Sequence, residues 1–317
     1  MQSRALPRPK AMNVDWREYL VYIGFAVLFI VFAVTLHGDG FTTRSNLLNI
    51  VRQTAIIATM AVAMTFVIAA GHIDLSVGAV AGLCSVTTAM AIEQWGLVPG
   101  ILAGLLTGIA VGGLNGFLVT QLVIPSFLVT LGMMGVARGL AMWITNTAPV
   151  PILNSVYYNV FGAGNLGPIP SLLIWITIVT FVGYMVLRKT TYGRQVLATG
   201  GNEAAARFSG VDTSRIVFLV LTVSGAVAGL AGMLYAGRLR SGRFSWGEGD
   251  ELSVIAAVVL GGTSLFGGRG SVVGSVLGAL LIGVVNNGLI LMGLETSQQL
   301  MIRGGIIIIA VALARRR

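Results

Sequence analysis

Charged residues are scarce in this chain: only 10% of its 317 residues are Asp, Glu, Lys or Arg. A soluble domain carries about 25% charged residues, so this composition excludes an ordinary soluble fold. Cysteine is almost absent as well, and the single Cys84 lies in an apolar stretch. One cysteine can form neither an intrachain disulfide nor a cysteine-based metal site, and we predict no metal site in the chain.

Groups that commonly carry catalysis are also few. The only histidines are His37 and His72, and no HExxH or GxSxG pattern occurs. The Gly-rich stretch 261–270, GGTSLFGGRG, lacks the Lys-Ser/Thr ending with which a phosphate loop holds a nucleotide. We therefore expect a tight hairpin there and no ATPase site. The sequence predicts a protein that is not an enzyme and binds no cofactor itself.

Apolar residues, in contrast, make up 56% of the sequence, and the mean hydropathy is +0.89. These values predict an all-α integral membrane protein, a polytopic bundle of about ten transmembrane helices. The 43 glycines are consistent with close helix packing in lipid. The eighth apolar stretch is short enough to be a re-entrant or broken helix. The predicted spans lie near 19–36, 54–70, 77–92, 99–118, 125–144, 171–187, 215–237, 252–265, 272–292 and 299–314.

The distribution of Lys and Arg predicts the orientation. If both termini are cytoplasmic, thirteen of these residues lie on the cytoplasmic side, five lie outside and two fall inside spans. We therefore read the net charge of +9 as a topology signal and not as a sign of nucleic-acid binding. The predicted organisation is a cytoplasmic tail (1–18), a transmembrane domain (19–314) and a basic C-terminal end (315–317).

A basic island, residues 188–215, separates two long apolar stretches, and the charge count places it on the cytoplasmic side. Its centre, 202–210, reads as one short helix. Asn202 is suited to cap the first turn, and Gly210 is suited to the left-handed exit position. A short helix held between two spans is well placed to be pushed by a protein outside the bilayer.

Six polar or charged side chains fall within or beside the apolar stretches, and two interpretations are open for them. They line a translocation pathway, where they hydrogen-bond a neutral polar solute, or they are structural. In the structural interpretation Asp74 caps the third span, His72 faces the headgroups and the amides bond neighbouring helices. Arg138 has to snorkel, pair or face a wet cavity. The six residues are His72, Asp74, Asn115, Arg138, Asn286 and Asn287.

Four blocks of sequence resemble a known family. They are GHIDLSVGAVAGL (71–83), LVIPSFLVTLGMMGVARGL (122–140), ATGGNEAAARFSG (198–210) and VIAAVVLGGTSLFGGRGSVVGSVLGALLIG (254–283). They are similar to the permease subunits of bacterial ABC importers for monosaccharides, the ribose/xylose/galactose type, in the branched-chain amino acid permease superfamily. The blocks occur in family order over nearly the whole chain. His72 makes the first block look most like xylose-type permeases.

The resemblance implies a multi-pass permease in the bacterial inner (plasma) membrane that moves a monosaccharide, such as the pentose xylose or ribose, into the cytoplasm by alternating access. It implies cytoplasmic ABC ATPase subunits that bind ATP and Mg, a periplasmic sugar-binding protein, and a second permease subunit in a homodimer surrounded by lipid. Glu203, Ala204, Ala205 and Gly210 match the EAA…G pattern by which such permeases engage their ATPases. Together with Asn202 they form the predicted coupling site.

Three alternatives to a sugar importer fit the sequence less well. A branched-chain amino acid ABC permease needs partners for an ammonium and a carboxylate, whereas the spans offer mainly amides and small residues. An ion-coupled secondary transporter needs acidic relays, for which Asp74 is the only strong candidate, and it leaves the coupling island without a purpose. A membrane-embedded enzyme is disfavoured because the chain has no acid/base or metal cluster.

Overall fold

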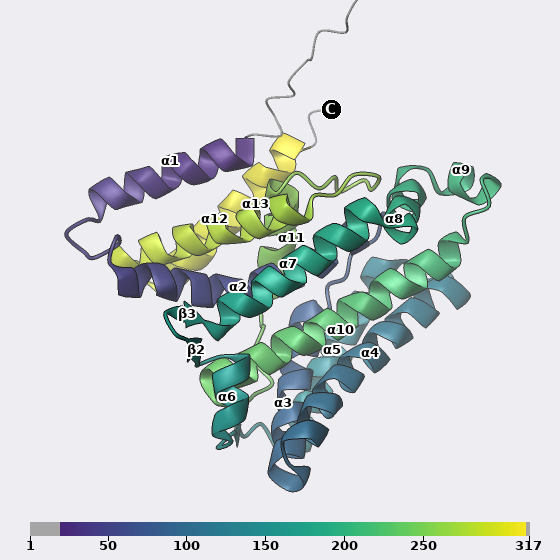
Figure 1. Ribbon diagram of the computed structural model, residues 1–317. Helices are drawn as coiled ribbons and strands as arrows, with labels where there is room; N and C mark the ends of the chain where they lie inside the picture. The colour runs from purple at the N-terminus through teal and green to yellow at the C-terminus, as the bar shows by residue number, and fades with distance from the viewer. Residues whose placement is uncertain (1–19, 315–317) are drawn as a thin grey trace, which may run out of the picture.

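Helices form most of residues 20–314, the part of the chain that the computed structural model describes (Figure 1). The helices are α1 (Leu20–Thr35), α2 (Arg44–Ala69), α3 (Val77–Trp95), α4 (Leu97–Gln121), α5 (Ser126–Thr145), α6 (Ser155–Phe161), α7 (Ser171–Lys189), α8 (Thr191–Gly201), α9 (Glu203–Phe208), α10 (Thr213–Leu239), α11 (Asp250–Leu260), α12 (Val272–Leu291) and α13 (Thr296–Ala314). Two antiparallel pairs of two-residue strands complete the fold: β1 (Val150–Pro151) with β4 (Ser241–Gly242), and β2 (Asn165–Leu166) with β3 (Ile169–Pro170).

Seven helices are long and apolar enough to cross a membrane: α2, α3, α4, α5, α7, α10 and α12. The structure therefore confirms a helical membrane protein, although its seven candidate spans among the described residues fall short of the ten predicted. Each predicted stretch does contain a helix, but α1 has only 16 residues and α11 only 11. The predicted tail 1–18 and the basic end 315–317 lie outside the described residues, so the sidedness of the termini stays a prediction.

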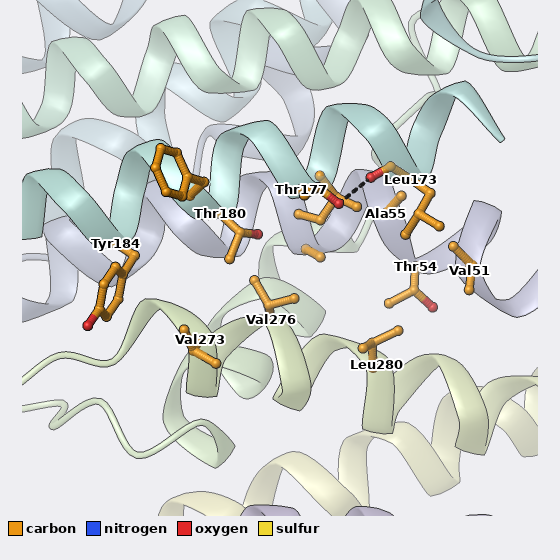
Figure 2. Close-up of a pocket in the computed structure, with 13 residues that line it drawn as sticks. Val51, Thr54, Ala55, Leu173, Thr177, Thr180, Tyr184, Val273, Val276 and Leu280 are labelled. Carbon is orange, nitrogen blue, oxygen red and sulfur yellow. Dashed lines mark hydrogen bonds between the residues drawn. The ribbon is translucent and has the colours of Figure 1, made fainter. Parts of the chain in front are cut away.

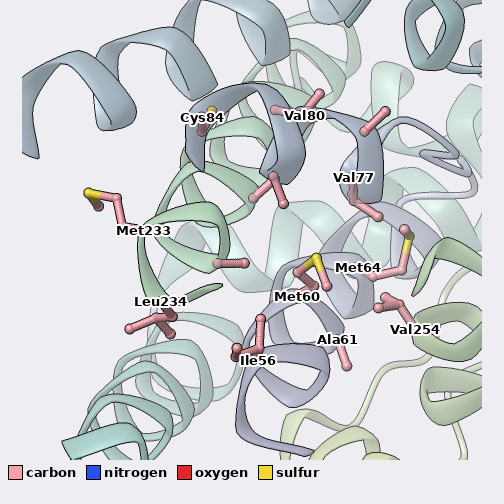
Figure 3. Packing of buried hydrophobic residues seen from close by; sticks show 14 of the residues in the cluster. Ile56, Met60, Ala61, Met64, Val77, Val80, Cys84, Met233, Leu234 and Val254 are labelled. Carbon is pink, nitrogen blue, oxygen red and sulfur yellow. The ribbon is translucent and has the colours of Figure 1, made fainter. Parts of the chain in front are cut away.

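Glycine lets helices α4 and α10 touch backbone to backbone. Gly108 of α4 faces Gly225 of α10 so closely that a β-carbon on either residue would overlap the carbonyl oxygen of the other. Such contacts gain dispersion energy where no hydrophobic force draws helices together in lipid. Around α2, larger side chains fill the space, and Figure 3 shows Met60 and Met64 packed beside Val77 of α3 and Val254 of α11.

The eighth predicted stretch is a broken span. Helix α11 is about 16 Å long at 1.5 Å per residue, roughly half of the 30 Å hydrocarbon core. The chain before it lies along α3, with Gly242 against Ser85 and Gly247 against Gly78. The segment 242–249 thus runs part of the way along α3, and α11 continues from there to the start of α12, where Gly261 contacts Gly274. Of the two predicted possibilities, a re-entrant helix and a broken helix, the broken helix fits this geometry.

The segment 70–76 between α2 and α3 enters the bundle in a similar way. It starts beside α8, where Gly71 approaches Gly200, and it ends with Asp74 hydrogen-bonded to Ser224 near the middle of α10. The segment 242–249 contacts the first turn of α3, where Gly247 meets Gly78, two residues after the end of the segment 70–76. Non-helical backbone at membrane depth is tolerated only where protein buries it or where it lines a wet cavity.

Candidate translocation and coupling sites

Asp74 lies at the centre of a closed polar network. It is fully buried, and its Oδ1 accepts hydrogen bonds from the Ser76 backbone N–H at 2.9 Å and the Ser76 hydroxyl at 2.6 Å. Its Oδ2 accepts from the Ser224 hydroxyl of α10 at 2.8 Å. The predicted cap on α3 is therefore wrong in detail, because Ser76 is the N-cap residue and Asp74 bonds that residue and α10 instead. Asp74 ties the segment 70–76 to a neighbouring helix.

The predicted amides occupy two separate places. Asn115 of α4 is buried and donates from Nδ2 to the Ser76 hydroxyl at 3.0 Å, which adds α4 to the Asp74 network. Asn287 of α12 exchanges two hydrogen bonds with Asn46 of α2, at 2.9 and 2.8 Å. Asn286 is half-buried and lies outside both groups. Bonding between helices accounts for Asn115 and Asn287.

Arg138 forms an ion pair within the length of α5. Its Nη1 lies 2.9 Å from Oε1 of Glu248, in the non-helical segment before α11. The two side chains are 27% and 57% exposed, so neither is enclosed by this chain. A half-exposed ion pair in a membrane-spanning helix needs water or another polar surface, since charges are costly in hydrocarbon. The pairing alternative for Arg138 is confirmed.

Further polar groups surround this ion pair. At the start of α11, Asp250 is buried and accepts a hydrogen bond from the Tyr235 hydroxyl of α10. The neighbouring Glu251 is half-buried and has one carboxylate oxygen without a hydrogen-bond partner. The segment 248–251 therefore carries three carboxylates, of which Glu248 pairs with Arg138 and Asp250 bonds Tyr235.

The predicted coupling helix exists and has the predicted ends. Asn202 accepts a hydrogen bond from the Ala205 N–H at 3.0 Å, and Gly210 has a φ of +85°. Within α9 only Ala206 is buried, and Phe208 is 95% exposed. Figure 1 shows α9 next to α8 at the edge of the helical bundle. The preceding helix α8 was not predicted as a separate element. It packs on the bundle, so α9 projects from a firm base.

Glu203 is not free on this surface. It accepts hydrogen bonds from Arg207 at 2.7 Å and from the Thr213 hydroxyl at 3.1 Å, so it fastens α9 to the start of α10. His72 lies beyond the end of α2, within the electrostatic reach of Glu203. Burial lowers the pKa of His72, and the Glu203 carboxylate acts in the opposite direction.

An apolar groove lies between α2, α7 and α12 (Figure 2). Its volume is about 470 Å³, and Thr54, Leu173, Tyr184, Val276 and Leu280 are among the residues that line it. The lining has few groups that could recognise sugar hydroxyls. None of the six predicted pathway residues lines this groove, so the groove and the candidate polar path are different places.

Several functional contacts were missed from the sequence. Ser76, Ser224 and Glu248 complete the two polar clusters. Ser76 lies within the block 71–83 but was not predicted as a site residue, and Ser224 and Glu248 form part of no local pattern. Glu248 lies 110 positions from Arg138, so only the fold brings them together. For Ser224, a lone hydroxyl in an apolar helix is too common to be a signal.

Comparison with known proteins identifies the family. The family described as "Branched-chain amino acid transport system / permease component" matches residues 46–311. The chain belongs to this permease family. It is 40% identical to the ribose import permease protein of Bacillus subtilis over 298 residues, which cover 93% of this chain and 92% of that protein. No solved structure matches the chain.

Other relatives in this family have names that refer to different sugars. The L-arabinose ABC transporter permease protein of Azospirillum brasilense is 39% identical over 92% of this chain and 86% of its own length. The D-allose transport system permease protein of Escherichia coli is 34% identical over 97% of this chain and 94% of its own length. The resemblance found in the four sequence blocks is therefore confirmed at the level of the permease family.

Proposed function

We propose that this chain is the membrane-spanning permease of an ATP-driven, binding-protein-dependent monosaccharide importer in the bacterial inner membrane. The proposed substrate is a pentose such as ribose or xylose. Relatives named for ribose, arabinose and allose support a sugar over a branched-chain amino acid. The proposed assembly contains two copies of this chain with cytoplasmic termini, cytoplasmic ABC ATPases that bind ATP and Mg, and a periplasmic sugar-binding protein.

The observation that carries this proposal is the exposed helix α9 on the firm base of α8. An ABC permease without an ATPase site of its own needs a surface on which the ATPase can push. The residues Asn202, Glu203, Ala204, Ala205 and Gly210 form this surface in the proposal, with Phe208 beside them as an exposed aromatic anchor. ATP-driven closure of the ATPases then shifts an equilibrium between inward-open and outward-open states.

The translocation path in this proposal runs past Arg138 and Glu248. These half-exposed charges need a wet surface, and charged or amide groups there match the hydroxyls of a neutral sugar. Discontinuous segments near the middle of the membrane are typical of substrate sites in transporters. In this proposal Asp74 and Asn115 hold the segment 70–76 beside the path. His72 lies in the part of that segment that is next to α8. Asn286 and Asn287 support α12 away from it.

Uptake by reconstituted complexes tests this function. The permease, a cognate ABC ATPase and a cognate binding protein are placed in proteoliposomes with radiolabelled ribose, xylose or leucine. We expect pentose uptake that requires ATP and survives an ionophore. Leucine uptake alone would establish the amino acid alternative. Uptake that continues without ATPase but collapses with the ion gradient would establish a secondary transporter.

A further inference from the structure

Three segments meet backbone to backbone where α8 ends. A β-carbon added to Gly200 of α8 would overlap the carbonyl oxygen of Ala69, the last residue of α2. A β-carbon added to Gly267, in the hairpin between α11 and α12, would overlap the carbonyl oxygen of Gly200. Gly200 is thus held between the end of α2 and the hairpin. We call this contact of Ala69, Gly200, Gly267 and Gly268 the glycine joint.

A hydrogen bond closes the joint on its third side. The Gly268 N–H donates to the same Ala69 carbonyl oxygen at 3.0 Å. Gly267 and Gly268 have φ values of +81° and +75°, which favour glycine and bring the hairpin this close. The Arg188 side chain at the end of α7 also donates to the Gly270 carbonyl at 3.3 Å. Contacts between backbones cannot be relieved by a change of rotamer, so a displacement of one segment displaces the others.

The joint is firmly connected to the coupling helix. Asn202 ends α8, with its N–H bonded to the Ala198 carbonyl, and its side chain caps α9 through the Ala205 N–H. Two residues therefore separate Gly200 from the first residue of α9. A push on α9 reaches Gly200 through one capped turn and not through a flexible linker.

Beyond the joint, the two partner segments lead to the two polar clusters. From Ala69 the chain continues through 70–76 to Asp74, which is bonded to α10. From Gly267 the hairpin leads back along α11 to Asp250, Glu251 and the Arg138–Glu248 ion pair. The glycine joint is thus the place where α8 meets both the start of the segment 70–76 and the α11–α12 hairpin.

We propose that Gly200 is a positioning residue that transmits displacement of α9 to the segment 70–76 and to the α11–α12 hairpin at the same time. This inference rests on the proposed function, because it takes α9 to be the surface on which the ATPase acts. The segment and the hairpin move together because both touch the same residue. The polar groups beside the substrate path then change position as ATP is bound and hydrolysed.

A matched pair of alanine variants tests this role. Gly200→Ala places a methyl group into the Ala69 carbonyl, whereas in Gly201→Ala the new β-carbon lies 3.6 Å from the Gly268 Cα, an ordinary contact. We expect Gly200→Ala to keep co-purification with the ATPase, since the exposed surface of α9 is unchanged. Sugar uptake per ATP hydrolysed should fall about tenfold, within the usual range of coupling between sites. Gly201→Ala should transport as the wild type does.

Hydrogen–deuterium exchange on the wild-type complex provides a second test if Gly200→Ala fails to fold. Exchange is compared with and without ATP plus vanadate in the segments 66–73, 197–203 and 262–270. The proposal requires protection to change in all three segments together. A change limited to 197–203, or wild-type coupling in a folded Gly200→Ala complex, overturns it. If the proposed function itself is wrong, the wild type shows neither ATPase co-purification nor ATP-dependent uptake.

Discussion

Two polar clusters of the described residues, the Asp74 network and the Arg138–Glu248 ion pair, differ in how far the chain encloses them. The Asp74 cluster is closed: both carboxylate oxygens are hydrogen-bonded and the side chain is buried. The Arg138–Glu248 cluster is open, because more than half of the Glu248 side chain is exposed. A closed cluster supports the fold, whereas an open one in a membrane protein needs water, a substrate or a partner. The contrast separates structural from transport roles among residues that look alike in the sequence.

The largest effect is expected for Asp74→Ala. The substitution removes the acceptor for the Ser76 N–H and hydroxyl and for the Ser224 hydroxyl, all within the bundle. Loss of a buried, multiply bonded carboxylate lowers the free energy of unfolding by about 3–5 kcal/mol. Denaturation of the purified permease in detergent measures this loss.

Asp74→Asn is the matched control. It keeps the shape of the side chain and one acceptor oxygen, so we expect the complex to assemble with about 1–2 kcal/mol lost. Equal stability of Asp74→Ala and the wild type would contradict a closed cluster. A transport defect in a fully stable Asp74→Asn complex would show that Asp74 also has a role in the path.

An intermediate effect is expected for the open cluster. Arg138→Glu and Glu248→Arg each replace the 2.9 Å ion pair with two neighbouring like charges, whereas the double reversal restores a pair of opposite charges. We expect each single variant to insert normally and to lose roughly tenfold in uptake, equivalent to about 1.4 kcal/mol of interaction energy. Uptake normalised to permease in proteoliposomes measures the loss. Single variants with wild-type uptake would show that the ion pair is not beside the path.

The helical membrane class could be predicted from the sequence because long apolar stretches determine it. Boundaries were predicted less well: α2 begins at Arg44, ten residues before the predicted stretch at 54. Its first turns carry Asn46 and Arg52, whose polar groups bond Asn287 and Asn165 in distant segments. Such partners are invisible to hydropathy. The broken span was predicted from the shortness of the eighth apolar stretch. The course of the segment 242–249 along α3 was not predicted, because no local pattern shows it.

The short helix α9 and its ends were predicted better than the contacts of the candidate path residues, because the signals of a short helix are local. Asn202 and Gly210 are cap positions within one short helix, and a cap depends on neighbours in sequence. The polar residues of the path depend on neighbours in space instead. Asp74, Asn115 and Asn287 looked equivalent to Arg138 in the sequence, and only the fold distinguishes the bonded and buried groups from the half-exposed ion pair.

The smallest effect on stability is expected at the candidate coupling surface, where the second ion pair of the described residues sharpens the comparison. Arg207 and Glu203 lie 2.7 Å apart, closer than Arg138 and Glu248, but their side chains are 60% and 53% exposed on a helix outside the bundle. Water screens such a pair, so Arg207→Ala should cost only about 0.5 kcal/mol despite the shorter distance. Phe208→Ala should leave the free energy of unfolding unchanged, because its ring touches little of this chain.

For association with the ATPase we expect the opposite ranking, with the largest effect at α9. Phe208→Ala removes an exposed aromatic anchor, and we expect it to weaken ATPase binding by about tenfold in a pull-down titration, as hot-spot residues do. Arg138 is a residue of α5 and not of α9. The Arg138→Glu permease should therefore bind the ATPase normally although its uptake falls. If Phe208→Ala binds as the wild type does while Arg138→Glu does not, the assignment of α9 to docking and of the open ion pair to the path is wrong. Stability, uptake and docking therefore separate one buried cluster and two partly exposed ion pairs that composition alone groups together.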